Sequence, residues 1–214
     1  MKTAFVSLFI IAMLTPGASS LANPIPLPWC GWENGETVLF LSGTGDPPIL
    51  VSNVPNPAPD PVSAGTFSLR LEDNSPSGTP YAAIATIYDL NDGDQVTVGF
   101  WRYDTTPGSS PSCRIWAHWN DSLPDDPLAN DGSASGNLDY GPGLGWDYTS
   151  YTWTVVEGHT GLVIEARTYS DPGDVVWIDN LDILPPDDCT IVSPCWLIVD
   201  TEQTSLGAVK ALYR

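Results

Sequence analysis

Eight residues in three short stretches of the chain have side chains that could bind a sugar. Aromatic faces stack against the apolar faces of sugar rings, while Arg, Glu and His side chains hydrogen-bond the hydroxyl groups. Within each stretch the candidates stand at every second position, which places them on one face of a β-strand. They are Trp101, Tyr103, Arg114, Trp116, His118, Glu165, Arg167 and Tyr169. If the three strands are neighbours, these side chains form one patch; otherwise the aromatics fill gaps beneath loops and the charged residues pair on a solvated sheet.

Two acidic positions far apart in the sequence could bind a metal ion. Glu33 lies in a Trp-Glu-Asn-Gly segment, and Asp179 lies in a Trp-Ile-Asp-Asn segment. These segments could meet in a sandwich, where two carboxylates together with backbone carbonyls would suit Ca²⁺, a cation that prefers oxygen ligands. The alternative is a hydrogen-bonded acidic strand end without a metal. A second acidic stretch, at residues 121–131, does not have the spacing of an EF-hand loop.

Motifs of catalysis are missing from the sequence. It contains no G-x-S-x-G elbow, no H-E-x-x-H, no phosphate-binding loop and no Rossmann glycine fingerprint. A glycosidase needs two carboxylates facing one cleft, and Glu165 is the only acidic residue that strand alternation places on the aromatic face. We therefore expect a protein without enzymatic activity.

The region from Glu36 to Asp182 predicts an all-β fold. Short runs rich in Val, Ile, Thr, Tyr and Trp alternate with Gly, Pro, Asn and Asp clusters, without helical periodicity. The expected strands are 37–41, 49–54, 67–71, 82–88, 95–103, 113–119, 150–155, 162–169 and 175–183. Alternation directs a set of side chains to the core: Val96, Val98, Phe100, Ile115, Ala117, Leu162, Ile164 and Ala166. These features predict an antiparallel two-sheet jelly-roll sandwich.

The N-terminal residues and the charge indicate an exported protein. Lys2, an apolar run from Ala4 to Leu14 and small residues before Asn23 are typical of a signal peptide covering residues 1–22. No later segment is apolar for long enough to cross a bilayer. The formal net charge of −19 would repel nucleic acid and anionic membranes. We expect a secreted or cell-surface monomer.

All four cysteines lie in the part of the chain that would be exported, where disulfides can form. Cys189 and Cys195 flank a short segment that contains Pro194, so a local disulfide is expected there, which leaves Cys30 to pair with Cys113. The other two pairings stay open. Zinc binding is disfavoured, because the sequence has no C-x-x-C pair and no histidine cluster to supply tetrahedral ligands.

The strand pattern ends at Pro185 and Pro186. This break predicts one sandwich domain over residues 23–185 and a C-terminal tail over residues 186–214. In the tail, Leu206, Val209 and Leu212 recur at helical spacing ahead of the basic C-terminal residue, so a short terminal helix is expected. A sorting signal is the alternative to an end without function.

Several motifs between Trp32 and Ile183 resemble those of the jelly-roll carbohydrate-binding modules of families 4, 9 and 22, which have a galactose-binding-like sandwich. Trp-Glu-Asn-Gly at 32–35 is similar to the Phe-Glu-x-Gly that opens these modules, and Val-Trp-Ile-Asp-Asn-Leu-Asp-Ile at 176–183 is similar to their closing strand. Residues 65–71 and 90–101 also match. The resemblance implies that Glu33 and Asp179 are structural calcium ligands and that exposed aromatics such as Trp101 and Trp116 bind glycan.

Two hypotheses on function follow. The first is a secreted, non-catalytic module that binds a polysaccharide or other glycan and is stabilised by calcium. The second is an extracellular structural or adhesive protein that binds no specific sugar. Coplanar, solvent-accessible rings of Trp101, Trp116 and Tyr169 on one sheet would favour the first hypothesis, whereas buried or scattered rings would favour the second.

Overall fold

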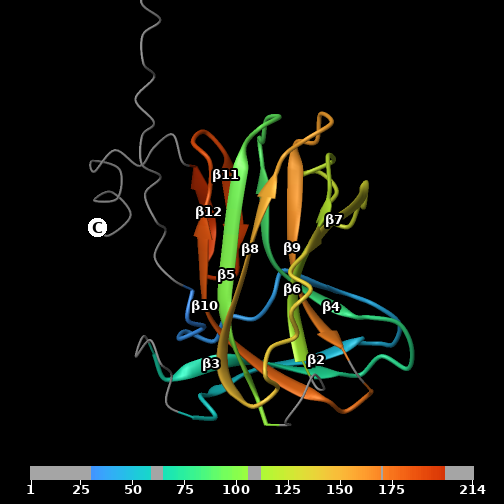
Figure 1. The fold of residues 1–214 in the computed structure, drawn as a ribbon, viewed down its shortest axis with the longest axis vertical. Coiled ribbons are helices and arrows are strands. Elements are labelled where there is room, and N and C mark those ends of the chain that lie inside the picture. The colour runs from blue at the N-terminus through green and yellow to red at the C-terminus, as the bar shows by residue number, and fades with distance from the viewer. Residues whose placement is uncertain (1–29, 59–64, 106–111, 170, 201–214) are drawn as a thin grey trace, which may run out of the picture.

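The computed structural model describes residues 30–58, 65–105, 112–169 and 171–200, with only the backbone described for Ser112, Tyr169 and residues 196–200. Over these residues the chain forms strands and turns without a helix (Figure 1). The strands are β1 (Phe40–Ser42), β2 (Ile49–Pro55), β3 (Phe67–Asp73), β4 (Tyr81–Tyr88), β5 (Gln95–Asp104), β6 (Ser112–Trp119), β7 (Gly132–Gly136), β8 (Gly145–Thr154), β9 (Gly161–Tyr169), β10 (Val175–Leu184), β11 (Thr190–Ser193) and β12 (Trp196–Asp200).

The strands pair into two antiparallel sheets. A five-stranded sheet has the order β2-β3-β10-β5-β8, and a seven-stranded sheet has the order β12-β11-β4-β9-β6-β7, with β1 also paired to β4. Consecutive strands β5 and β6 belong to different sheets, so the chain crosses between the layers after Asp104. The predicted all-β sandwich is therefore confirmed.

One hydrophobic core lies between the two sheets, and the sequence alternation identifies its residues correctly. The side chains that were expected to point inward are all fully buried: Val96, Val98, Phe100, Ile115, Ala117, Leu162, Ile164 and Ala166. Burial of each large aliphatic or aromatic side chain contributes about 1.5–3 kcal/mol to folding. Trp32 is also fully buried, and its indole nitrogen donates a hydrogen bond to the carbonyl oxygen of Thr37 at 2.9 Å.

Three strands were not expected from the sequence. Strand β7 lies inside the long segment between β6 and β8 that was expected to be a loop, and β11 and β12 lie beyond Pro186. Since β11 pairs with β4 and β12 with β11, the sheet continues past the boundary predicted at residue 185. The predicted signal peptide and terminal helix lie outside the described residues. No helix in the described part of the chain has the length and apolar character needed to span a membrane.

The disulfide differs from the predicted pairing. Cys30 and Cys195 are bonded, with a Cα–Cα distance of 5.5 Å, while Cys113 and Cys189 are buried and lie outside this bond. Cys195 lies in the turn between β11 and β12, and β11 separates it from Cys189. The four extended residues of β11 span about 13 Å, which is longer than a disulfide can bridge. Burial raises the pKa of the Cys113 thiol to about 12.

Candidate functional site

The outer face of the seven-stranded sheet contains most of the predicted sugar-binding residues. Strands β6 and β9 pair in a register that places Trp116 opposite Glu165 and Arg114 opposite Arg167. All four side chains point away from the core, because they alternate with the buried residues of the same strands. His118 follows on the same face of β6. The predicted neighbourhood of these two stretches is therefore present.

Glu165 and His118 lie at the bottom of this face. Both are buried, and His118 Nδ1 is 2.6 Å from Glu165 Oε1. Arg167 donates a hydrogen bond from Nε to the other carboxylate oxygen, Oε2, at 2.5 Å. Both residues belong to the predicted sugar-binding set; neighbouring side chains bury them in this structure, and their contact with a ligand stays a prediction. In this arrangement Glu165 holds Arg167 in place and is itself contacted by His118.

Above this buried pair lies a group of half-buried aromatic and basic side chains, which we call the Trp116 cluster: Tyr81, Arg114, Trp116, Tyr140 and Arg167. The guanidinium carbon of Arg167 lies 4.7 Å from the centre of the Trp116 ring, and that of Arg114 lies 5.2 Å from it. Arg114 also lies 4.4 Å from the Tyr140 ring. The Trp116 indole nitrogen donates a hydrogen bond to Ser133 Oγ at 3.1 Å, which fixes the ring orientation.

Sequence reasoning missed two aromatic members of the cluster. Tyr81 begins β4, opposite Arg167, but the expected strand began one residue later. Its alternation with buried Ala82 would have placed it outward. Tyr140 stands in the loop before β8, where no periodicity exists to predict its position. Burial raises the pKa of Tyr81, so its phenol stays protonated and can donate a hydrogen bond.

An apolar groove lies on the same outer face of β4, nearer to the other end of the strand. It has a volume of about 300 Å³ and is lined by Leu39, Phe40, Thr86, Tyr88, Leu123, Pro124, Pro127 and Val192. Thr86 pairs with Val163 of β9, which in turn pairs with His118 of β6. The groove and the Trp116 cluster therefore belong to one face of one sheet.

Trp101 and Tyr103 do not join this cluster. Both are on β5 and point outward from the five-stranded sheet, so the three stretches are not all neighbours and the condition for one continuous patch is not met. They pack there against aromatic residues of β8 and β10: Trp101 against Tyr148 at 5.5 Å, and Tyr103 against Trp146 at 5.2 Å and Trp177 at 5.7 Å. The rings of these neighbouring pairs are inclined by 55–76° to each other. Because Trp101 and Trp116 lie on different sheets, the single face of coplanar rings that was expected for glycan binding is not formed, and this criterion does not support a site that uses both tryptophans. The side chain of Tyr169, the remaining candidate, lies outside the described residues.

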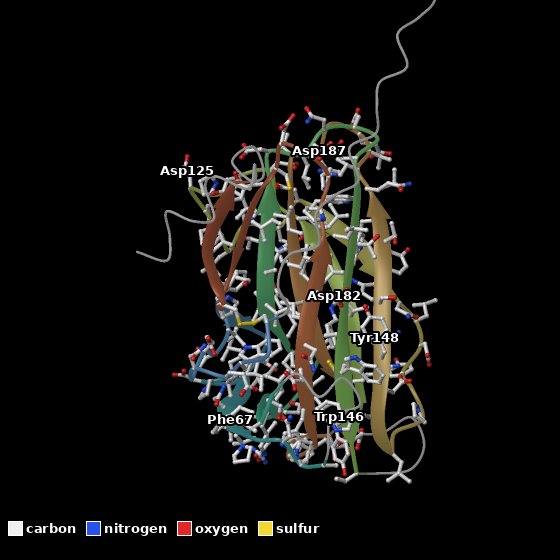
Figure 2. The ribbon with its side chains drawn as sticks, turned by 90° about the vertical axis from the view of Figure 1, so that its left-hand side faces the viewer. Phe67, Asp125, Trp146, Tyr148, Asp182 and Asp187 are labelled. Atoms are coloured by element: carbon white, nitrogen blue, oxygen red, sulfur yellow. A yellow bond between two sulfur atoms is a disulfide. The ribbon has the colours of Figure 1, made fainter. Side chains whose placement is uncertain are left out.

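The five-stranded face also carries a hydrogen bond between two acids of very different strength. Tyr148 Oη donates to Asp182 Oδ1 at 2.8 Å, and Figure 2 shows the two residues beside each other, with Trp146 nearer the end of the sheet. The tyrosine lies over Gly99, where an added Cβ would be 2.0 Å from its hydroxyl. Burial raises the pKa of both groups, and the bond to Asp182 raises that of Tyr148 further.

The two predicted metal ligands lie near each other at one edge of the sandwich. A Cβ placed on Gly31 would be 3.6 Å from Asp179 Oδ1 and 3.7 Å from Glu33 Oε1, so both carboxylates lie near this glycine. Glu33 Oε1 accepts hydrogen bonds from the backbone N–H groups of Thr66 and Phe67 at 2.9 and 3.0 Å. Asp179 is fully buried at the bulge of β10.

Neutral oxygens would have to complete any cation site there. Among the described residues, no group of three or more His, Cys, Asp or Glu side chains could hold a metal ion. Asn56 Nδ2 lies 3.4 Å from Asp179 Oδ2, and Asn56 Oδ1 has no hydrogen-bond partner among the described residues. A buried carboxylate, a nearby second carboxylate and an unsatisfied amide oxygen fit the oxygen-rich shell that Ca²⁺ prefers.

The second acidic stretch is occupied by hydrogen bonds that close its own loop. Asp131 accepts the backbone N–H of Asp121, and Asp121 accepts the backbone N–H of Thr160 and contacts His159 Nδ1 at 2.9 Å. Burial acts to raise the pKa of Asp121, but these hydrogen bonds outweigh it and lower the pKa. The stacked rings of Trp119 and His159, 4.6 Å apart, complete this loop anchor.

No protein-family model and no curated protein matches the chain. Several solved structures are similar to it in fold. The tandem family-22 carbohydrate-binding domain of Paenibacillus barcinonensis Xyn10C superposes with a TM-score of 0.52 and 14% identity, over 79% of this chain and 48% of that one. The xylan-binding CBM22-1 domain of the same protein superposes with a TM-score of 0.45 and 14% identity, over 76% of this chain and 95% of that one. The enzymatically active domain of tailspike protein 4 from bacteriophage CBA120 superposes with a TM-score of 0.47 and 19% identity, over 67% of this chain and 19% of that one.

These identities show the fold alone. The chain spans less than half of the tandem domain and a minor part of the tailspike domain. In fold, the β-sandwich of this chain is similar to the tandem family-22 domain, in agreement with the jelly-roll sandwich that the sequence resemblance implied.

Proposed function

We propose that this chain is a glycan-binding protein whose binding site is the Trp116 cluster. The observation that carries the proposal is the arrangement of Trp116 beside two arginines, with tyrosine hydroxyls of Tyr81 and Tyr140 within the same cluster. Aromatic faces can stack on the apolar side of a sugar ring, while guanidinium and phenol groups hydrogen-bond its hydroxyls. The fold shared with carbohydrate-binding domains supports this reading, and so does the groove further along the same face.

The proposed role is binding without catalysis. Glu165, the acid nearest to the cluster, is fully buried and is engaged by His118 and Arg167. A glycosidase would need two carboxylates flanking the scissile bond across a cleft. The disulfide between Cys30 and Cys195 supports export, because such bonds persist in oxidising compartments. We place the protein outside the cell, in agreement with the signal peptide expected from the sequence.

A glycan-array screen of the purified chain tests this function, followed by titration of any ligand into two single variants. Trp116→Ala removes the central ring of the cluster, and Trp101→Ala removes a half-buried tryptophan from the opposite sheet as a matched control. We expect Trp116→Ala to abolish binding while Trp101→Ala keeps it, with both variants folded by circular dichroism. Loss of binding in Trp101→Ala alone would move the site to the five-stranded face. Absence of binding to all soluble and insoluble glycans tested would favour the structural or adhesive role.

We further propose that Ca²⁺ binds between Glu33 and Asp179 and stabilises the fold. The two carboxylates both lie near Gly31, and the amide nitrogen of Asn56 lies 3.4 Å from Asp179 Oδ2, while the buried amide oxygen of Asn56 has no hydrogen-bond partner among the described residues. Bound there, the ion would offset the cost of the buried Asp179 charge and link the N-terminal segment to β10.

Thermal unfolding in calcium and in EGTA tests this second proposal. Calcium is expected to raise the melting temperature of the wild-type chain and to leave Asp179→Asn unaffected. Asp182→Asn, three residues along the same strand, is the control that should keep the calcium response. An equal melting temperature of the wild-type chain in calcium and EGTA would contradict the proposal.

A further inference from the structure

The Trp116 cluster places two arginines directly opposite each other. Arg114 of β6 and Arg167 of β9 are register partners on neighbouring strands, and both are half-buried on the same face. Like charges at directly opposed positions of a sheet destabilise it. Stacking on aromatic rings offsets part of this cost, because each guanidinium lies over one or more ring faces.

The chain has very few positively charged residues, so the placement of two arginines side by side is unusual for this sequence. The whole sequence has seven Lys and Arg residues against 26 Asp and Glu, and the described residues contain only the four arginines Arg70, Arg102, Arg114 and Arg167. Half of these four meet in one cluster. Glu165 is the carboxylate that Arg167 contacts, and it is shared with His118. Glu165 balances the charge of one arginine, so the cluster combines two guanidinium groups with one carboxylate on a protein whose formal net charge is −19.

The stacked arrangement leaves the geometry of anion recognition intact. A guanidinium group uses its flat face for stacking on a ring, whereas its N–H donors lie in its plane and point outward from the edge. The same group can therefore stack on Tyr140 or Trp116 and donate paired hydrogen bonds to a carboxylate. Two such groups side by side match one planar anion attached to a sugar ring.

We propose that the glycan bound by this site is anionic, with a uronate carboxylate held by Arg114 and Arg167 while its sugar ring contacts Trp116. This inference rests on the proposed glycan-binding function and specifies the ligand class. The overall negative charge repels polyanions at long range, so recognition of an acidic glycan requires the local pair of arginines.

The test compares a polyuronate with its carboxyl-reduced form, which has the same linkages and no charge, by calorimetric titration of the full chain at physiological salt. We expect a preference of about tenfold or more for the polyuronate, the size that a charge-assisted hydrogen bond provides. Arg114→Gln should bring the ratio of the two affinities toward one. Arg70→Gln, on the opposite sheet, should keep the wild-type ratio.

The outcomes separate this inference from the proposed function. Equal affinity for both forms, or binding to neutral glycans alone, would overturn the anionic ligand while leaving glycan binding in place. Failure to bind any glycan would overturn both. A sulfated dextran serves as a polyanion without carboxylates. If it binds no better than unsulfated dextran while the polyuronate is preferred, the site recognises a carboxylate and not any negative charge. Tight binding of every polyanion tested would contradict that specificity.

Discussion

Removal of the disulfide between Cys30 and Cys195 should cost a large part of the folding free energy. The bonded residues are 165 positions apart, so the bond closes a loop that includes nearly the whole described chain. The loop-closure entropy of an unfolded chain of this size corresponds to about 5 kcal/mol at 25 °C. For a protein of about this length, that loss lowers the melting temperature by about 10–20 °C.

Calorimetry with and without a thiol reductant measures this effect. We expect the reductant to lower the melting temperature of the wild-type chain and to leave the double variant Cys30→Ala, Cys195→Ala unchanged. Cys189→Ala is the matched control: it removes a buried thiol outside the disulfide and should keep the full response to reductant. An unchanged melting temperature of the wild-type chain in reductant, or loss of the response in Cys189→Ala, would refute the assignment of the disulfide to Cys30 and Cys195.

Three further predictions concern the two sheet faces. Glu165→Gln removes the buried charge shared by a histidine and an arginine and should lower the free energy of unfolding by about 3 kcal/mol in urea titrations; a loss below about 1 kcal/mol would contradict the network. Because burial raises the pKa of Asp182 in the folded state, its contribution favours the fold at low pH and is lost as the pH rises through that raised pKa. Urea titrations across this pH range should therefore show that the free energy of unfolding of Asp182→Asn rises relative to that of the wild type as the pH increases. A difference in unfolding free energy that stays constant with pH would refute the raised pKa of Asp182. Gly136→Ala would place a Cβ 2.3 Å from a backbone carbonyl and should cost about 2 kcal/mol, whereas Gly99→Ala meets a tyrosine side chain that can move and should cost about 1 kcal/mol.

Part of the core could be predicted because apolar and polar residues alternate along stretches of the sequence. In β5 and β9 the alternation of apolar and polar side chains identified the buried face without knowledge of the neighbouring strands. Strand β7 could not be predicted in this way. Its sequence, Gly-Ser-Ala-Ser-Gly, has no residue with high strand propensity, and it forms because it pairs with β6, where close approach of the backbones requires glycine at Gly136.

The candidate site was predictable in part for a related reason. Alternation placed Arg114, Trp116 and Arg167 on outward faces, and the structure brings these three together. Alternation gives no information on which strands share a sheet. Trp101 of β5 was therefore grouped with the residues of β6 and β9, although β5 and β6 lie in different sheets. Strand order depends on pairing between distant segments, such as β4 with β11, and leaves no local signal in the sequence.

The central claim is that the outer face of the seven-stranded sheet binds glycan, and the affinity of Trp116→Ala relative to Trp101→Ala tests it most directly. Calorimetric titration of both variants with the best ligand from a glycan screen should show a loss of about 2 kcal/mol, or about 30-fold in affinity, for Trp116→Ala. Trp101→Ala should bind as the wild type does. Equal affinities of the two variants and the wild type would contradict the account.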